Sequence, residues 1–204
     1  MTLDRDSCEY ELLQTAAASI VAEQVPGLTC EIGVRAGGGS QVILDELTGS
    51  PLAYTHIAID PWGSLPYPNR HGVLSGDSGY DNRMKRQALA DLYWYANCIG
   101  VDLWVAPMTD SEFFRRFADG VPLYRDGATL LANDYALVHY DARHTTHAVL
   151  EQVKFFGPRS VKGTRWVFDD YDWYDWPQVV YLAEMYGFGD ARMGARKLVM
   201  GRTS

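Results

Sequence analysis

The chain has 204 residues, with 18 Lys and Arg against 26 Asp and Glu, so its formal net charge is −8. Hydrophobic residues make up 47% and charged residues 22%, which is typical of a globular protein and excludes a disordered or collagen-like chain. The acidic balance, the lack of a basic run and the lack of a ~20-residue apolar span lead us to expect neither a nucleic acid nor a membrane as partner.

Strands and helices alternate along the chain, and the hydrophobic periodicity sets their bounds. Residues 64–78 are rich in Gly, Pro, Ser and Asn and predict a loop, which is a candidate lid and carries His71. The last segment, 187–201, predicts an antiparallel hairpin. We expect strands at 29–34, 56–59, 101–106, 135–140 and 164–168, and helices at 7–25, 40–48, 80–98, 110–118, 147–156 and 177–186.

This alternation predicts an α/β fold with a mostly parallel sheet covered by helices on both faces. Right-handed crossovers place the carboxyl ends of all parallel strands along one edge, where ligands bind. Polar or glycine-rich loops follow five of the predicted strands, so we expect them to form one cleft. They are residues 35–40, 60–63, 108–111, 141–144 and 169–172.

A glycine-rich segment follows the first strand and reads Glu31-Ile-Gly33-Val-Arg35-Ala-Gly37-Gly-Gly-Ser40. Glycines allow a tight turn and a close approach of the backbone to a ligand, and the next helix presents free N–H groups. The segment lacks the Lys-Ser/Thr pair of a phosphate-binding P-loop. It also lacks the middle glycine of GxGxxG, where Arg35 stands, so neither a nucleoside triphosphate cradle nor a typical dinucleotide site is expected.

The second strand ends at Asp60-Pro61-Trp62-Gly63. An acidic residue at this position can accept hydrogen bonds from both hydroxyls of a ribose, or it can close an Asx turn before proline. Trp62 either stacks on an adenine or covers the edge of the core.

Together, Glu-Ile-Gly-x-Arg-x-Gly-Gly-x-Ser and Ile-Asp-Pro-Trp-Gly resemble the class I S-adenosylmethionine-dependent methyltransferases, and most closely the small-molecule O-methyltransferases of the macrocin/novobiocin type. The resemblance covers about residues 29–186. It implies a three-layer sandwich around a Rossmann-like sheet of seven strands, mostly parallel, with an antiparallel last strand. The cofactor residues that we expect are Glu31 and Gly33 under the methionine part, Asp60 at the ribose, Met108 and Thr109 beside the adenine, and with them Arg35, Gly37, Ser40 and Trp62.

Three carboxylates follow the fourth and fifth strands, Asp141 after one and Asp169-Asp170 after the other. Neighbouring strands lie about 4.8 Å apart, so these side chains can converge, and they repel one another unless a cation lies among them. Oxygen ligands favour Mg²⁺, which can lower the pKa of a bound substrate hydroxyl. The metal-dependent O-methyltransferases are similar here, and the similarity implies Asp141, Asp169 and Asp170 as magnesium ligands.

The general base that this resemblance implies is Asp141 or His144. Such enzymes often have Asp-Gly-Asp where this chain has Asp141-Ala142-Arg143, so an arginine replaces the second acid. Arg143 is available to pair with Asp170 or with an anionic substrate. The aromatic residues of the segment 171–176 either wall an acceptor pocket or pack under the last helix.

Two other functions stay open. His139, Asp141, His144 and His147 could bind zinc in a metal-dependent hydrolase, although their spacing matches no strong zinc motif. A non-catalytic module that keeps a nucleotide-binding fold is the second alternative.

We therefore predict one domain over residues 1–204, with residues 1–27 as an N-terminal helical extension. Its predicted function is S-adenosylmethionine-dependent and Mg²⁺-dependent O-methylation of a small hydroxylated acceptor. Cys8, Cys30 and Cys98 fit no disulfide framework, and the N-terminus lacks a signal-peptide pattern, so the cytoplasm is the expected compartment. The first helix packs on its own sheet or on a neighbouring subunit, which leaves a homo-oligomer open.

Overall fold

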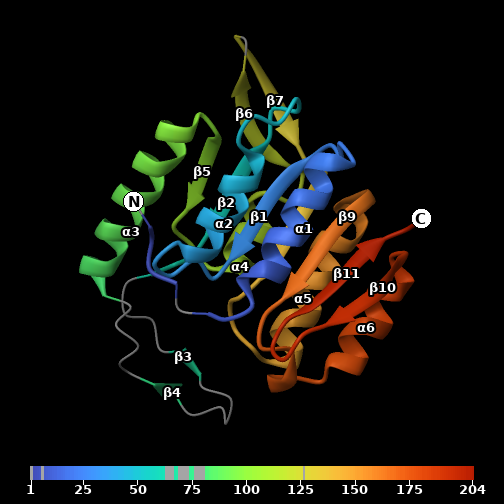
Figure 1. Cartoon of the computed structure of the whole chain (residues 1–204). Coiled ribbons are helices and arrows are strands. Elements are labelled where there is room, and N and C mark those ends of the chain that lie inside the picture. Colours follow the sequence, from blue (N-terminus) through green and yellow to red (C-terminus); the bar gives the residue numbers. More distant parts are fainter. Residues whose placement is uncertain (1, 6, 63–66, 69–73, 76–80, 126) are drawn as a thin grey trace.

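The structure is a computed structural model that describes residues 2–5, 7–62, 67–68, 74–75, 81–125 and 127–204 (Figure 1). Most of the predicted lid, including His71, lies outside the described residues. Within it the structure describes two short paired strands, β3 (Tyr67–Pro68) and β4 (Leu74–Ser75).

Seven strands form the central sheet, in the order β10-β11-β9-β8-β1-β2-β5. The first five strands in chain order are parallel, and the last strand runs antiparallel to both of its neighbours, which confirms the predicted sheet. The strands are β1 (Leu28–Ile32), β2 (Thr55–Ile59), β5 (Asp102–Ala106), β8 (Tyr135–Tyr140), β9 (Ser160–Phe168), β10 (Phe188–Met193) and β11 (Leu198–Arg202).

Helices cover both faces of this sheet, as Figure 1 shows. One face carries α1 (Tyr10–Ala22), α2 (Gly38–Leu47) and α3 (Asn82–Ile99), and the other carries α4 (Asp110–Arg116), α5 (Thr146–Phe156) and α6 (Trp176–Met185). Strands β1, β2 and β8 are buried along their whole length, as expected for the central strands of a sheet that is covered on both faces. The three-layer sandwich is confirmed.

Helix α1 packs on the sheet of its own chain, where Leu13 and Ala17 contact the core around Leu137 and Val167. This settles the alternative in which it would need a neighbouring subunit. Among the described helices, none combines the length and the apolar character that crossing a membrane requires.

Side chains just before their first residues cap two of these helices. Asp81 caps α3, because its carboxylate accepts a hydrogen bond from the Met84 N–H at 2.8 Å. Thr109 caps α4, because its hydroxyl accepts a hydrogen bond from the Glu112 N–H. The Asp110 side chain has other partners, described below.

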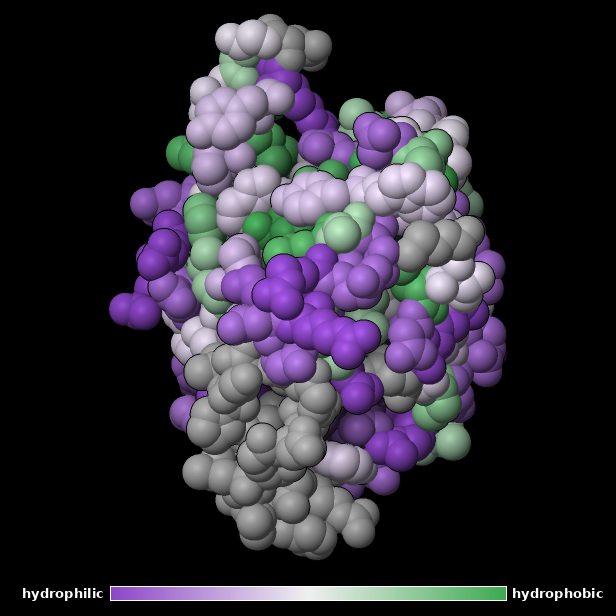
Figure 2. Space-filling model, turned by 90° about the vertical axis from the view of Figure 1, so that its left-hand side faces the viewer, coloured by the Kyte–Doolittle hydropathy of each residue, from purple (hydrophilic) through white to green (hydrophobic). Residues whose placement is uncertain are grey.

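A hairpin of β6 (Val121–Arg125) and β7 (Ala128–Ala132) was missed by the sequence analysis. It projects from the body of the protein, as Figures 1 and 2 show from two sides. Val121 and Leu123 reach the core, but Leu130 and Leu131 are exposed. Because β7 has no buried face, its sequence lacks the alternation by which a half-buried strand is recognised.

Candidate functional site

The five predicted loops do meet at the carboxyl edge of the sheet. The Arg35 N–H donates to Asp60 Oδ2 at 2.9 Å, which joins the first two loops. Arg143 pairs with Asp110 at 3.0 Å, and His144 Nε2 lies 3.8 Å from Asp170 Oδ2. These contacts join the loops after β5, β8 and β9, so the convergence predicted from strand order is confirmed.

The glycine-rich turn after β1 needs glycine at Gly33 for two reasons. Its φ is +89°, a conformation that L side chains rarely adopt, and a Cβ atom there would lie 2.1 Å from the Asp141 carbonyl oxygen. The backbone of this turn therefore lies directly against the loop that carries Asp141. Gly37, with φ +95°, precedes the first turn of α2, where free N–H groups are available to a ligand.

The Asp60 side chain connects the loop that follows β2 with the loop that follows β1. Its two carboxylate oxygens accept from the backbone N–H groups of Arg35 and Trp62, at 2.9 and 2.7 Å. The side chain is buried, and this desolvation raises the pKa of Asp60 to about 6 although the N–H donors act in the opposite direction. Each oxygen still has a lone pair, so hydrogen bonds to ribose hydroxyls are chemically compatible with this arrangement.

The Trp62 side chain is part of the core. It is 1% exposed, packs with Leu44 and Leu92, and donates its indole N–H to the Arg35 carbonyl at 2.8 Å. Of the two roles left open for Trp62, core packing is correct and adenine stacking is wrong. The reason is that the loop turns this side chain inward under the glycine-rich segment.

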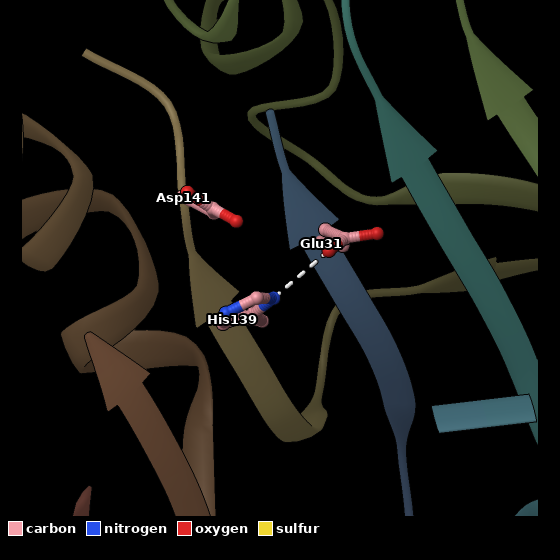
Figure 3. A group of neighbouring side chains, drawn as sticks. All are labelled: Glu31, His139 and Asp141. Carbon is pink, nitrogen blue, oxygen red and sulfur yellow. Dashed lines mark hydrogen bonds and ion pairs between the residues drawn. The ribbon is translucent and has the colours of Figure 1, made fainter. Parts of the chain in front are cut away.

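A buried polar chain crosses the sheet below the glycine-rich turn. Thr29 Oγ1 contacts His56 Nδ1 at 2.9 Å, and His56 Nε2 contacts Ser40 Oγ at 3.0 Å. Ser40 Oγ donates to Glu31 Oε2 at 2.5 Å, and Glu31 Oε1 contacts His139 Nδ1 at 2.9 Å (Figure 3). Both oxygens of Glu31 are thus engaged inside the protein, so Glu31 and Ser40 support the turn from below.

The sequence analysis missed the role of His56, although a histidine within an apolar strand was the available signal. Burial lowers its pKa to about 3, and the nearby His139 adds to this effect. His56 is therefore neutral at physiological pH and can bridge two hydroxyl groups. Gly39 lies over the Glu31–His139 pair, and a Cβ atom there would come 1.9 Å from Glu31 Oε1.

The predicted zinc cluster is not assembled. His139 is buried beside Glu31, whereas His147 is exposed on α5. Figure 3 shows the one group of described residues with metal-ligand geometry, Glu31, His139 and Asp141, whose ligand atoms lie within 4.8 Å of one another. The hydrogen bond between Glu31 and His139 already engages Oε1 and Nδ1, whereas the buried His139 Nε2 has no hydrogen-bond partner among the described residues.

The three expected magnesium ligands do converge, but cationic side chains accompany two of them. Lys197 Nζ lies 2.7 Å from Asp169 Oδ1, and Arg196 forms an ion pair with Asp170. Burial acts to raise the pKa of Asp169, but the charges of Lys197 and His139 and the hydrogen bonds from Lys197 and Ser7 together outweigh it, and the pKa falls to about 2. The sequence analysis missed both cations; the adjacent basic residues in the turn of the predicted hairpin were the signal.

Of the three carboxylates, Asp141 is the one that no lysine or arginine among the described residues contacts. Burial and the negative charge of Asp169 raise its pKa well above the usual range for aspartate. His144 Nε2 lies 3.7 Å from Asp141 Oδ1, and its ring packs edge-on against Trp173. Burial lowers the pKa of His144 despite the neighbouring carboxylates, so a neutral imidazole that can accept a proton stands at this edge.

The remaining residues that the sequence analysis predicted for the site lie around these groups. Arg143 pairs with Asp110, so its expected pairing with Asp170 is wrong, because Arg196 occupies that carboxylate. Met108 packs partly buried on the core, beside the cap formed by Thr109. Of the aromatic segment, Trp173 faces His144, whereas Tyr174 is buried in the core.

Comparison with known proteins adds independent findings. A methyltransferase-domain family model matches residues 30–171. No curated protein matches the sequence.

Similar solved structures cover nearly the whole chain. The O-methyltransferase NovP has 16% sequence identity and a TM-score of 0.59, over 96% of this chain and 79% of that one. The calicheamicin methyltransferase CalS11 has 15% identity and a TM-score of 0.60, over 95% and 78%. The O-methyltransferase TomG from Streptomyces achromogenes, in complex with SAM, has 14% identity and a TM-score of 0.58, over 97% and 82%.

Gly33→Ala should destabilise the protein by more than about 3 kcal/mol, because strain at positive φ adds to a clash with backbone atoms that cannot move aside. Gly49→Ala is the matched control: Gly49 has φ +71° but open space around its Cβ position, so it should lose only about 1 kcal/mol. Urea unfolding of both variants measures the difference. Equal losses would show that the close approach to Asp141 is absent.

His56→Gln should make the free energy of unfolding depend less on pH below about pH 6.5. The folded pKa of His56, about 3, lies below the unfolded value of 6.5. Only the unfolded chain therefore gains this proton as the pH falls below 6.5, and His56 lowers the unfolding free energy by up to ~1.4 kcal/mol per pH unit. Between pH 6.5 and 5, wild type should lose about 2 kcal/mol more than the variant in urea titrations. Parallel profiles would contradict a buried, neutral His56.

Proposed function

The chain belongs to the methyltransferase-domain family, and from this membership we propose that it transfers the methyl group of S-adenosylmethionine to a hydroxyl oxygen of a small acceptor. The observation that carries the proposal is that His144, with its side chain 10% exposed, lies beside Asp141 and Asp170 at the sheet edge that also carries the glycine-rich turn and Asp60. The structurally similar NovP and TomG are O-methyltransferases by description, and the latter binds SAM.

The cofactor would lie over the turn that begins at Gly33, where the missing side chains let backbone approach it closely. Asp60 would accept hydrogen bonds from the ribose hydroxyls, and Met108 and Thr109 would flank the adenine. S-adenosylmethionine supplies an electrophilic methyl group on a sulfonium sulfur. The acidic edge suits this cationic group, because a nearby positive charge favours the ionised form of Asp141, with which no Lys or Arg of the described residues forms an ion pair.

His144 is the general base in this proposal. As the acceptor oxygen forms its bond to the methyl carbon and the sulfur–carbon bond breaks, the hydroxyl proton passes to Nε2 of His144. Asp141 and Asp170, at 3.7 and 3.8 Å from that nitrogen, stabilise the imidazolium that results. Trp173 holds the ring from the side, which keeps Nε2 directed toward the two carboxylates.

Magnesium was expected on Asp141, Asp169 and Asp170, and these residues do not fit a divalent ion as they are arranged. Both oxygens of Asp169 are bonded, to Lys197 at 2.7 Å and to the Ser7 hydroxyl at 2.6 Å, and Asp170 is paired with Arg196. The proposed reaction therefore includes no step through a metal ion.

The cofactor proposal is tested by calorimetric titration with S-adenosylmethionine. We expect wild type to bind and Asp60→Ala to bind at least about tenfold more weakly, because the loop from Arg35 to Trp62 loses the carboxylate that closes it. Asp119→Ala, at an exposed position, is the control and should match wild type. A wild-type protein that does not bind millimolar cofactor would overturn the proposed function.

The base is tested with His144→Gln. We expect a loss of about 10²-fold or more in kcat, with cofactor affinity unchanged, because only proton transfer is impaired. In wild type, the lowered pKa of His144 keeps the imidazole neutral as the pH falls, so kcat/KM should decline only below pH 6.5. His147→Gln, on the exposed side of α5, should keep wild-type kinetics. Full activity of His144→Gln would assign the base elsewhere.

A further inference from the structure

The turn between β10 and β11 carries two consecutive cationic residues to the acidic pair after β9. Lys197 meets Asp169 and Arg196 meets Asp170. We propose that these two side chains take the place of a divalent cation at this edge, so that the protein binds no Mg²⁺ there and methyl transfer does not require a metal ion. This inference rests on the proposed methyl transfer for its second half only.

The contact of Lys197 is fully enclosed. Its side chain is 0% exposed and that of Asp169 is 3% exposed, and their charged atoms lie 2.7 Å apart. Lys197 Nζ also donates to Ser7 Oγ at 2.9 Å, and Ser7 in turn donates to Asp169 Oδ2 at 2.6 Å. Ammonium, hydroxyl and carboxylate thus form a closed triangle, and the Asp170 backbone N–H also donates to Asp169 Oδ1 at 3.0 Å. Both lone pairs of Oδ1 are therefore engaged, and one of the two on Oδ2 is engaged by Ser7.

Separating this pair is costly. Removing one partner of a buried, hydrogen-bonded ion pair leaves the other charge without compensation and is strongly destabilising. A divalent ion that kept Lys197 in place would lie within a few ångströms of a positive charge in a region of low dielectric. Metal binding at Asp169 is therefore unfavourable whether Lys197 is displaced or stays in place.

The turn that carries the cations is itself held in place. The Glu9 carboxylate accepts from three consecutive backbone N–H groups, those of Ala195, Arg196 and Lys197, at 2.8, 2.7 and 3.0 Å. Gly194 leaves the room for this contact, since a Cβ atom there would lie 2.4 Å from Glu9 Oε1. The Arg196 carbonyl also accepts from the Tyr171 N–H at 3.2 Å, which ties the turn to the loop after β9.

Charge balance at the edge leads to the same conclusion. Asp141, Asp169 and Asp170 bring three acidic groups, and Lys197 with Arg196 bring two positive charges, so 3 − 2 leaves one acidic group without a cation. A divalent ion would leave the edge with a net positive charge, whichever form Asp141 takes, and would oppose the cationic sulfonium of the proposed cofactor.

Mn²⁺ binding to the full-length chain tests the inference directly, with free Mn²⁺ measured by electron paramagnetic resonance and without cofactor or acceptor. Wild type should bind no more tightly than about 1 mM. Lys197→Met removes the cation from Asp169 Oδ1, whereas Ser7 still donates to Oδ2, and this variant should bind at least about tenfold more tightly. Lys197→Arg keeps the charge and should stay like wild type, as should Lys154→Met, which removes an exposed ion pair with Glu151.

A micromolar Mn²⁺ site in wild type that is lost in Asp169→Asn would overturn the inference. If Lys197→Met does not fold, as thermal melting would show, the wild-type and Asp169→Asn titrations still decide it. Where methyl transfer is measurable, EDTA should change the wild-type rate by less than about twofold, and a larger loss restored by Mg²⁺ would also overturn it. Failure of the proposed function would appear separately, as absent cofactor binding.

Discussion

Buried carboxylates at one edge of the sheet each require a partner, and this requirement organises the site. A buried charge without compensation is costly enough that a protein neutralises it, hydrogen-bonds it or excludes it. Four acidic side chains are buried among the described residues, and each is compensated by different hydrogen-bond or ion-pair partners. Glu31 uses a serine and a histidine, Asp60 uses two backbone N–H groups, Asp110 uses Arg143 and Gln152, and Asp169 uses Lys197 and Ser7.

These four sets of partners explain how the loops acquire defined positions. The Glu31 contacts hold the start of α2 against β1 and β8, and the Asp60 contacts close the loop from Arg35 to Trp62. Asp110 connects α4 with α5, and Asp169 connects the N-terminal segment with the last hairpin. The same bonds that remove the cost of burial therefore position the proposed cofactor loop beside His144.

Prediction from sequence succeeded where the signal was local. The strand Tyr135–Tyr140 was predicted with its observed bounds, because a fully buried strand is a continuous apolar run. It failed where a side chain had two environments available: Trp62 was placed beside an adenine as one alternative, and the loop turns it into the core. It also failed for the hairpin of Val121–Arg125 and Ala128–Ala132, whose second strand is exposed and carries no periodic pattern.

The sequence alone determined the order of strands and helices, and with it which loops share the carboxyl edge, because hydrophobic period and crossover handedness are properties of short segments. It thus determined that Asp141, Asp169 and Asp170 would converge. Only the tertiary structure decided what neutralises them. Ser7 and Lys197 are 190 residues apart in the chain yet lie 2.9 Å apart beside Asp169. Coulomb energy depends on distance in space, so the cation that meets each carboxylate is set when the two ends of the chain come together.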